Sequence, residues 1–435
     1  MMVRFDLINH SDFGHRLHSS AWARAARHRL RFGFLILISI FLPVLSGCWG
    51  SPKSDLSSTF DLKAIAIDPT TPTTLYVGTD GGGVFKSTDG GSTWVPINSG
   101  LTDLKVTALA IDWFTPYRVY AGTENGGIFA SLDFGESWAG LTNQAPITNI
   151  RAIAIDRNVC PPATPPIPSC KYIYVASQTS GVWRSIDGGF SYSAFNDNLS
   201  NSAVTAMAIF PTVLPYQGMS RLYVGTEGGG FFLRGIYPLP GDAQWTDASS
   251  SLKGLTQEEP VSMAVNPLSF SEVYIGTSGG GEASVGGSGI YKTTNSGTTF
   301  DLVYDPRFKF TIYFVVPVIG PGTADLTLYA GSDGIVRSDN NNDGIVGSWC
   351  ILWDDGSCTN TTPSKILQPG LTAFAVELFK HTDSNGNVSF LIDSATPATP
   401  TTPSIPTPTL YAALFNRQFI KSIDGGQTWT TLSVQ

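Results

Sequence analysis

The chain has 435 residues, a formal net charge of −8 and 42% hydrophobic residues, which is sufficient apolar content for a folded core. This acidic balance excludes nucleic-acid binding through counterion release. Only one of the five histidines, His381, lies beyond residue 47. The inventory therefore excludes a histidine-based catalytic triad or a multi-histidine metal site, and we predict no catalytic residues.

Residues 1–47 have the pattern of a signal peptide. Six arginines and two acidic residues precede an almost unbroken apolar run at 32–45, which has the length of a signal-peptide core and is short for a membrane span. The run ends in Leu45-Ser46-Gly47-Cys48, which resembles the lipobox of bacterial lipoprotein precursors. The alternative is a signal anchor with an incidental cysteine.

The lipobox resemblance implies cleavage before Cys48 and lipidation of that cysteine. The mature protein would be extracytoplasmic and anchored to a bacterial membrane, with residues 48–59 as a tether. Trp49 follows the cysteine where Asp would retain a Gram-negative lipoprotein at the inner membrane, so the resemblance implies the outer membrane. Removing residues 1–47 leaves 20 basic and 32 acidic residues, a net charge of −12.

Residues 60–435 contain one pattern that recurs seven times. Each copy has a strand of small and β-branched residues, a Tyr-Val-Gly-Thr-like phrase, a Gly-apolar-aromatic-x-Ser phrase and a strand that starts at an aromatic. A repeat of roughly 50 residues with several short strands is typical of a β-propeller. We predict an all-β fold, a single seven-bladed β-propeller of four-stranded blades. The second phrase recurs at Leu75–Thr79, Val119–Thr123, Ile173–Ser177, Leu222–Thr226, Val273–Thr277, Leu328–Ser332 and Leu410–Leu414.

A polar hairpin is expected between the third and fourth strands. Its clearest copy is Ser87-Thr88-Asp89-Gly90-Gly91-Ser92-Thr93-Trp94, in which the carboxylate is suited to accept backbone N–H groups and glycine to adopt a positive φ. Because one role recurs at equivalent positions, we interpret these acids as structural; the alternative is a ring of catalytic or metal-binding acids. They are Asp89, Asp133, Asp187 and Asp424.

This hairpin resembles the Asp-box (BNR) repeat of sialidases, sortilins, xyloglucan-degrading propellers and photosystem II assembly factors. As a repeat type, the resemblance covers nearly all of residues 60–435. The assembly-factor group, with one exported propeller, is the nearest in organisation and implies a protein-binding scaffold. The partner-binding surface of that group is described as rich in arginine, and this acidic chain has no comparable cluster.

The repeat is altered in its fourth and sixth copies. In the fourth, Arg234–Gln244 replaces the Asp-box. In the sixth, an Asp-x-Asn-x-Asp-Gly segment predicts a calcium site at Asp339, Asn341 and Asp343, because alternate side chains of such a loop converge on one cation. The twelfth position is Cys350 rather than the usual Glu, so an Asn/Asp-rich turn is the alternative.

Four further cysteines fall into two short loops. Proximity favours disulfides that pair Cys160 with Cys170 and Cys350 with Cys358, although four cysteines allow three pairings. Export to an oxidising compartment favours disulfides, and the alternative is free thiols.

Acidic residues occupy the turns between the second and third strands. These turns would form one end of the propeller, opposite the Asp-boxes, and could attract a basic partner, a cation or a sugar; the alternative is a set of solvated turn acids. We therefore predict a monomeric scaffold that binds a protein partner at the membrane surface. The alternative is a glycoside hydrolase or glycan-binding propeller that uses two of these carboxylates. The candidates are Asp80, Glu124, Glu227 and Asp333.

Overall fold

The computed structural model describes residues 60–113, 115–141, 147–156, 172–210, 221–228, 230–236, 244–249, 258–266, 269, 271–279, 289–304, 314–319, 326–331, 335–338, 349–352, 358–359, 371–376, 379–382, 388–391, 409–414, 419–423 and 428–432. The chain divides into two units, Met1–Pro52 and Lys53–Gln435, and every described residue belongs to the second unit.

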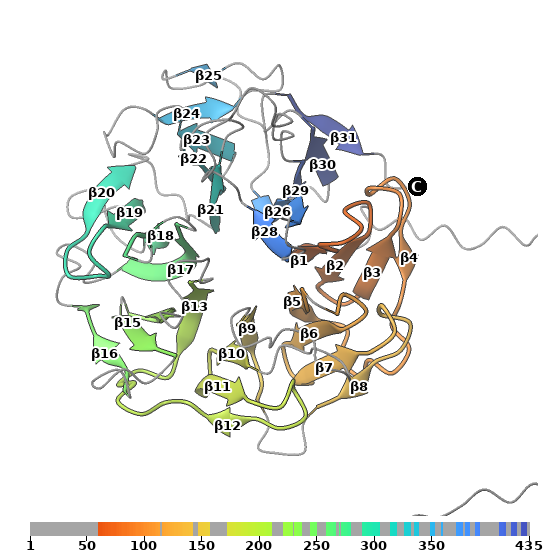
Figure 1. Cartoon of the computed structure of the whole chain (residues 1–435), viewed down its shortest axis with the longest axis horizontal. Helices are drawn as coiled ribbons and strands as arrows, with labels where there is room; N and C mark the ends of the chain where they lie inside the picture. Colours follow the sequence, from red (N-terminus) through yellow and green to blue (C-terminus); the bar gives the residue numbers. More distant parts are fainter. Residues whose placement is uncertain are drawn as a thin grey trace, which may run out of the picture. The chain divides into compact units, whose positions relative to one another are not determined.

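That unit is a β-propeller built from antiparallel sheets (Figure 1). Four of its four-stranded blades follow one another along the chain, and each is named here after its first strand. Their strands are β1 (Leu62–Ile67), β2 (Leu75–Thr79), β3 (Gly83–Ser87) and β4 (Val95–Pro96); β5 (Val106–Ile111), β6 (Val119–Thr123), β7 (Ile128–Ser131) and β8 (Ala139–Gly140); β9 (Ile150–Ile155), β10 (Ile173–Ser177), β11 (Gly181–Ser185) and β12 (Ser193–Ala194); and β13 (Val204–Ile209), β14 (Arg221–Thr226), β15 (Gly230–Gly235) and β16 (Thr246–Asp247).

The remaining sheets come from the C-terminal half. The β17 blade has β17 (Glu258–Val265), β18 (Val273–Gly279), β19 (Ile290–Thr293) and β20 (Asp301–Tyr304), and the β26 blade has β26 (Leu371–Val376), β29 (Leu410–Leu414), β30 (Phe419–Ser422) and β31 (Thr430–Leu432). Between them in sequence lies a five-stranded sheet of β21 (Phe314–Ile319), β22 (Leu326–Gly331), β23 (Ile335–Ser338), β24 (Trp349–Leu352) and β25 (Cys358–Thr359). A separate ribbon pairs β27 (Phe379–Thr382) with β28 (Val388–Leu391).

The structure shows six four-stranded blades, not the seven predicted. The segment expected to form another such blade forms the five-stranded sheet instead, because β25 pairs with the outer edge of β24, with Ile351 opposite Thr359 and Leu352 opposite Cys358. Cys350 and Cys358 therefore lie on neighbouring strands, whereas Cys160 and Cys170 lie outside the described residues. Both disulfides stay predictions.

The sheets are arranged radially, with their first strands innermost (Figure 1). The ring of first strands is continuous, because β1 contacts both β5 and β26, and each following first strand contacts the next. The second strands are buried along their whole length, as in β2, β6 and β10, whereas the outermost β4, β8 and β12 are exposed. Neighbouring sheets cover both faces of a second strand, and this explains its continuous apolar sequence.

The glycine of the Tyr-Val-Gly-Thr phrase permits this close stacking. A Cβ atom on Gly78 would lie 2.6 Å from Cγ1 of Val106 in the next blade, and one on Gly122 would lie 2.4 Å from Cγ2 of Ile150. Real Cβ contacts are never this short, so a side chain at either position would force the blades apart. The glycine is therefore required by the packing of adjacent blades rather than by backbone conformation.

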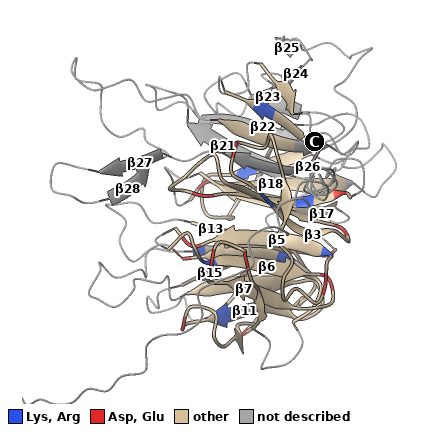
Figure 2. Cartoon of the chain, turned by 90° about the vertical axis from the view of Figure 1, so that its right-hand side faces the viewer, with Lys and Arg blue, Asp and Glu red and all other residues tan. Residues whose placement is uncertain are grey.

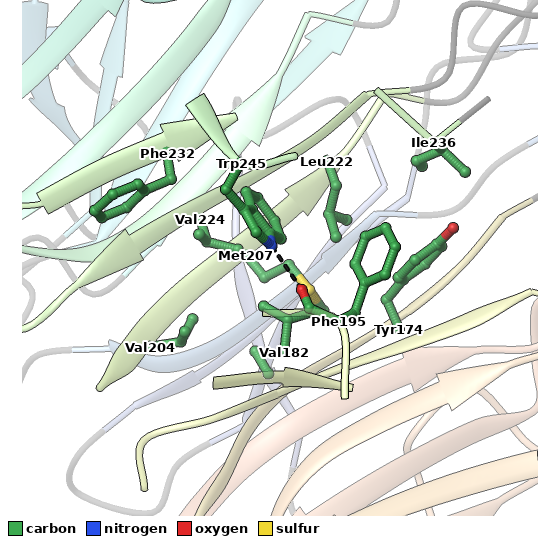
Figure 3. Packing of buried hydrophobic residues seen from close by; sticks show 11 residues of the cluster. Tyr174, Val182, Phe195, Val204, Met207, Leu222, Val224, Phe232, Ile236 and Trp245 are labelled. Carbon is green, nitrogen blue, oxygen red and sulfur yellow. Dashed lines mark hydrogen bonds between the residues drawn. The ribbon is translucent and has the colours of Figure 1, made fainter. Parts of the chain in front are cut away.

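Aromatic side chains join each blade to the one before it. In the cluster between the β9 and β13 blades (Figure 3), the indole of Trp245 packs edge-on against Phe195 and donates a hydrogen bond of 2.6 Å to the Phe195 carbonyl. Trp138 makes the equivalent bond, also 2.6 Å, to the carbonyl of Ile97 in the β1 blade. These contacts hold successive blades together.

Candidate functional site

The turns between second and third strands lie at the same end of the propeller as the links between blades. The backbone N–H of Asp80 donates to the carbonyl of Asp61, which precedes β1, and Glu124 donates in the same way to Lys105 before β5. Glu227 repeats the pattern with Ala203 before β13. We call this surface the turn end. The backbone thus holds three of the predicted candidates at equivalent positions.

The structure brings Asp80 and Glu124 together around one lysine. Lys105 lies 2.8 Å from a carboxylate oxygen of Glu124, and its backbone pairs with Asp80, which is 4.0 Å from Lys63. The hydrogen bond from Lys105 to Glu124, followed by the negative charges of Glu124, Asp80 and Asp103, raises the pKa of the lysine. The two candidate acids are therefore compensated by neighbouring lysines.

The rest of the turn end is mixed in charge. Gln178 occupies the acidic position in the β9 blade, where its side-chain oxygen accepts a hydrogen bond of 2.8 Å from Arg151. Glu227 is exposed in the β13 blade, and its carbonyl accepts a hydrogen bond from Asn201. Asp333 lies outside the described residues. Figure 2 shows the acidic residues in the loops that edge the blades. The described part of the turn end thus alternates acids with Lys63, Lys105 and Arg151.

The opposite surface, here called the hairpin end, carries the polar hairpins between third and fourth strands. The carboxylate of Asp133 accepts hydrogen bonds from the hydroxyl and backbone N–H of Ser137, at 2.6 and 2.9 Å, and from the hydroxyl of Ser131 at 2.7 Å. The Ser137 bonds, aided by Ser131, lower the pKa of this carboxyl. Asp89 and Asp187 make the same contacts in their hairpins.

The hairpin of the β17 blade achieves the same fold with an amide. Asn295 accepts the Thr299 backbone N–H at 2.8 Å through Oδ1 and donates to the Thr299 hydroxyl through Nδ2. An uncharged side chain therefore reproduces the pattern of the carboxylates. Because all of these contacts lie within one hairpin, they leave the side chains at the variable positions free to point outward.

Phe134 stands in a backbone conformation that an aromatic residue rarely adopts. Its φ is 60°, and the matching positions in the β1 and β9 blades are Gly90 and Gly188. The backbone is fixed by a hydrogen bond of 2.9 Å from its N–H to Tyr117 and by one from the Tyr76 hydroxyl to its carbonyl. The ring is nevertheless 43% exposed, with the Lys86 ammonium 5.7 Å from its centroid.

Exposed apolar side chains gather on these hairpins. Of the eight large hydrophobic residues that are exposed in the described part of the chain, five lie on hairpins between third and fourth strands. Four of them belong to the neighbouring β5 and β9 blades, and we call these four the hairpin patch. They are Leu132, Phe134, Ile186 and Phe190. Sequence reasoning missed them, although the first copy of the hairpin has Thr88, Gly90 and Ser92 at the corresponding positions.

Other predictions fall outside what can be placed. Asp424, the predicted calcium ligands and the lipidation residue Cys48 lie outside the described residues. Within the described ranges, no group of three or more His, Cys, Asp or Glu side chains is arranged to hold a metal ion. None of the described segments is a helix with the length and apolarity needed to cross a membrane.

Comparison with known proteins identifies the fold. No protein-family model matches the sequence, and no curated protein matches it. An ancestral GH74 enzyme is similar in structure, with a TM-score of 0.50 and 12% identity, over 85% of this chain and 56% of the enzyme. The structure of YCF48 bound to D1 peptide has a TM-score of 0.45 and 14% sequence identity, over 68% of this chain and 83% of that structure. YCF48 from Cyanidioschyzon merolae has a TM-score of 0.45 and 16% identity, over 74% of this chain and 88% of that structure. This chain thus spans little more than half of the GH74 enzyme, and the likeness shows the β-propeller fold alone.

Proposed function

We propose that this chain is an extracytoplasmic scaffold that binds a protein partner through the hairpin patch. The observation that carries the proposal is the backbone of Phe134. A left-handed conformation costs a non-glycine residue of order 1–3 kcal/mol. The hairpins of the β1 and β9 blades have glycine at this position, and the hairpin of the β17 blade has the small polar residue Ser296 with a φ of 56°. The ring packs edge-on against Tyr117 and lies 5.7 Å from the Lys86 ammonium, yet the residue stays 43% exposed. We infer that the exposed part of the ring is covered by a partner in a complex.

The partner is expected to be apolar with basic side chains nearby. Leu132 and Phe134 flank Asp133, and Ile186 precedes Asp187, so each apolar tip carries a carboxylate whose pKa is lowered. Apolar and aromatic groups supply most of the binding energy at protein interfaces, and complementary charge sets orientation and association rate. A segment that alternates apolar and basic residues meets both requirements.

The proposed lipid anchor would leave this patch accessible. Cys48 and the tether at 48–59 precede β1, which the chain enters beside Asp61 at the turn end. Twelve residues span at most about 40 Å, which is enough for the hairpin end to be reached by a partner. We expect Cys48→Ser to abolish precursor processing and membrane partition; a membrane-bound, processed variant would contradict the anchor.

The test uses the full-length chain, and it compares stability with binding. Phe134→Gly should raise the melting temperature, because glycine adopts this φ without strain, and should weaken capture of a stoichiometric partner from membranes at least tenfold. Leu302→Ser is the matched control, since Leu302 is 37% exposed outside the hairpin patch. It should retain capture.

Two results would contradict the proposal. One is capture that Phe134→Gly leaves unchanged, or that Leu302→Ser weakens as much as Phe134→Gly does. The other is conversion of a polysaccharide by the purified protein that Asp80→Asn or Glu227→Gln abolishes. The second result would favour the glycoside hydrolase alternative, with its site at the turn end.

A further inference from the structure

A surface pocket of about 640 Å³ lies between the β13 and β17 blades. It belongs to neither the turn end nor the hairpin patch, and the described residues that line it come from both blades. The β13 blade contributes Arg221, Leu233 and Asp247, and the hairpin of the β17 blade contributes Ser296 and Thr298, with Ser271 from the preceding turn. The volume is that of a small-molecule site.

A smaller pocket lies at the equivalent position between the β1 and β5 blades. Between the β1 and β5 blades the pocket is about 330 Å³, and it is lined by Lys86 and Glu136. Lys86 on β3 pairs with Val95 on β4, and Leu233 on β15 pairs in the same way with Thr246 on β16. Lys86 and Leu233 therefore occupy equivalent positions in their blades. The Lys86 ammonium lies 3.4 Å from Glu136 in the next blade, so this ion pair spans the groove.

Both members of that ion pair are replaced in the larger pocket. Leu233 stands at the position of Lys86, and Thr298 stands at the position of Glu136 in its hairpin. The change removes two long side chains that crossed the groove. At the same time Asp247 replaces Pro96, and Arg221 lines the wall. The groove between the β1 and β5 blades is therefore smaller and crossed by an ion pair, and the groove between the β13 and β17 blades is larger and has its own charged and hydroxyl groups.

The lining has a definite chemistry. Burial raises the pKa of the Tyr223 hydroxyl, and the nearby side chains of Arg221 and Ser296 oppose this shift. Oδ1 of Asp247 accepts a hydrogen bond of 2.8 Å from the Ser249 backbone N–H. Arginine pairs with carboxylates in a planar, two-bond geometry. The carboxylate of Asp247 and the hydroxyls of Ser271 and Thr298 suit ligand hydroxyls.

We propose that this pocket binds a short oligosaccharide that contains a carboxylate-bearing sugar. Leu233 supplies an apolar surface against which a sugar ring can pack. The hydroxyl groups of Ser271, Ser296 and Thr298 can form hydrogen bonds with the sugar hydroxyls, and Arg221 can pair with the carboxylate. The inference does not depend on the protein partner proposed above, because the pocket and the hairpin patch share no residues.

The test measures binding of trigalacturonate and maltotriose to the full-length protein by calorimetry. We expect trigalacturonate to bind with a stoichiometry of one and at least tenfold more tightly than neutral maltotriose. The double substitution Leu233→Lys with Thr298→Glu installs the ion pair of the β1–β5 groove, and it should weaken trigalacturonate binding at least tenfold without lowering the melting temperature. Arg221→Gln should remove the preference for trigalacturonate over maltotriose.

The matched control opens the other groove. Lys86→Leu with Glu136→Thr should leave trigalacturonate binding unchanged, because Pro96 and Thr74 stand there at the positions of Asp247 and Arg221. The proposal is overturned if trigalacturonate does not bind, if its binding survives the installed ion pair, or if maltotriose binds equally well.

Discussion

The acidic side chains at the two ends of the propeller are compensated in different ways, by lysines at the turn end and by hydrogen bonds within one hairpin at the hairpin end. At the turn end, Glu124 and Asp80 find partners in lysines from the inner strands and links, so their compensation depends on how neighbouring blades sit. At the hairpin end, Asp133 is saturated by Ser131 and Ser137 within its own hairpin. A hairpin that is stable by itself can vary its outward positions at little cost, and the exposed apolar residues lie there.

The largest predicted effect contrasts a buried with an exposed aromatic of the hairpin end. Trp138 is 5% exposed and is bonded to Ile97 of the adjacent blade, so Trp138→Ala should lower the free energy of unfolding by about 3–5 kcal/mol. Phe190 is 64% exposed, and Phe190→Ala should change it by about 0.5 kcal/mol or less. Urea unfolding checks both values, and equal losses would show that the hairpin tips are structural.

A smaller effect is expected from the hairpin carboxylates. Asp133→Ala leaves the Ser137 N–H and hydroxyl without their acceptor, at a cost of about 1–2 kcal/mol, as at helix N-caps. Asp133→Asn should keep most of the stability, because Asn295 fulfils the same role in the β17 blade. A loss in Asp133→Asn as large as in Asp133→Ala would mean that charge, not hydrogen bonding, stabilises the hairpin.

The same carboxylates make stability depend on pH. The pKa values of Asp89, Asp133 and Asp187 are lowered in the folded protein. Their contribution is therefore complete above the unfolded value, about 3.9, and is lost as pH falls through the lower folded values. Thermal unfolding between pH 7 and pH 2 should show this acid loss, and replacing all three with Asn should flatten it. If the triple variant loses as much thermal stability at low pH as the unmodified protein does, these three carboxylates are not the cause of the pH dependence.

The smallest effect is expected at the turn end. The side chains of Lys105 and Glu124 are 50% and 41% exposed, and exposed ion pairs contribute little to stability. Glu124→Gln should therefore lower the free energy of unfolding less than Asp133→Ala does, and 1 M NaCl should remove the difference by screening. A loss comparable to that of Asp133→Ala would mean that the two ends are equally structural.

Much of the fold could be predicted from local patterns. Phrases such as Leu75–Thr79 coincide with the strands found, because strand type and turn chemistry depend on neighbouring residues. The count of four-stranded blades was wrong, because β25 adds to β24 across a link that the repeat pattern does not contain. Asp80, Glu124 and Glu227 lie at the turn end, and their role in binding stays a prediction. The neighbouring lysines Lys63 and Lys105 were not foreseen.

By itself, the sequence determined the repeat, the β-propeller class and the hairpins, since the hydrogen bonds of Asp133 join residues at most four positions apart. Only the tertiary structure decided which charges are compensated and which groove is larger. The Lys86–Glu136 pair joins residues 50 positions apart, and its absence between Leu233 and Thr298 becomes meaningful once the blades stand side by side. Such contacts depend on how successive blades pack, and a local sequence pattern does not determine that packing.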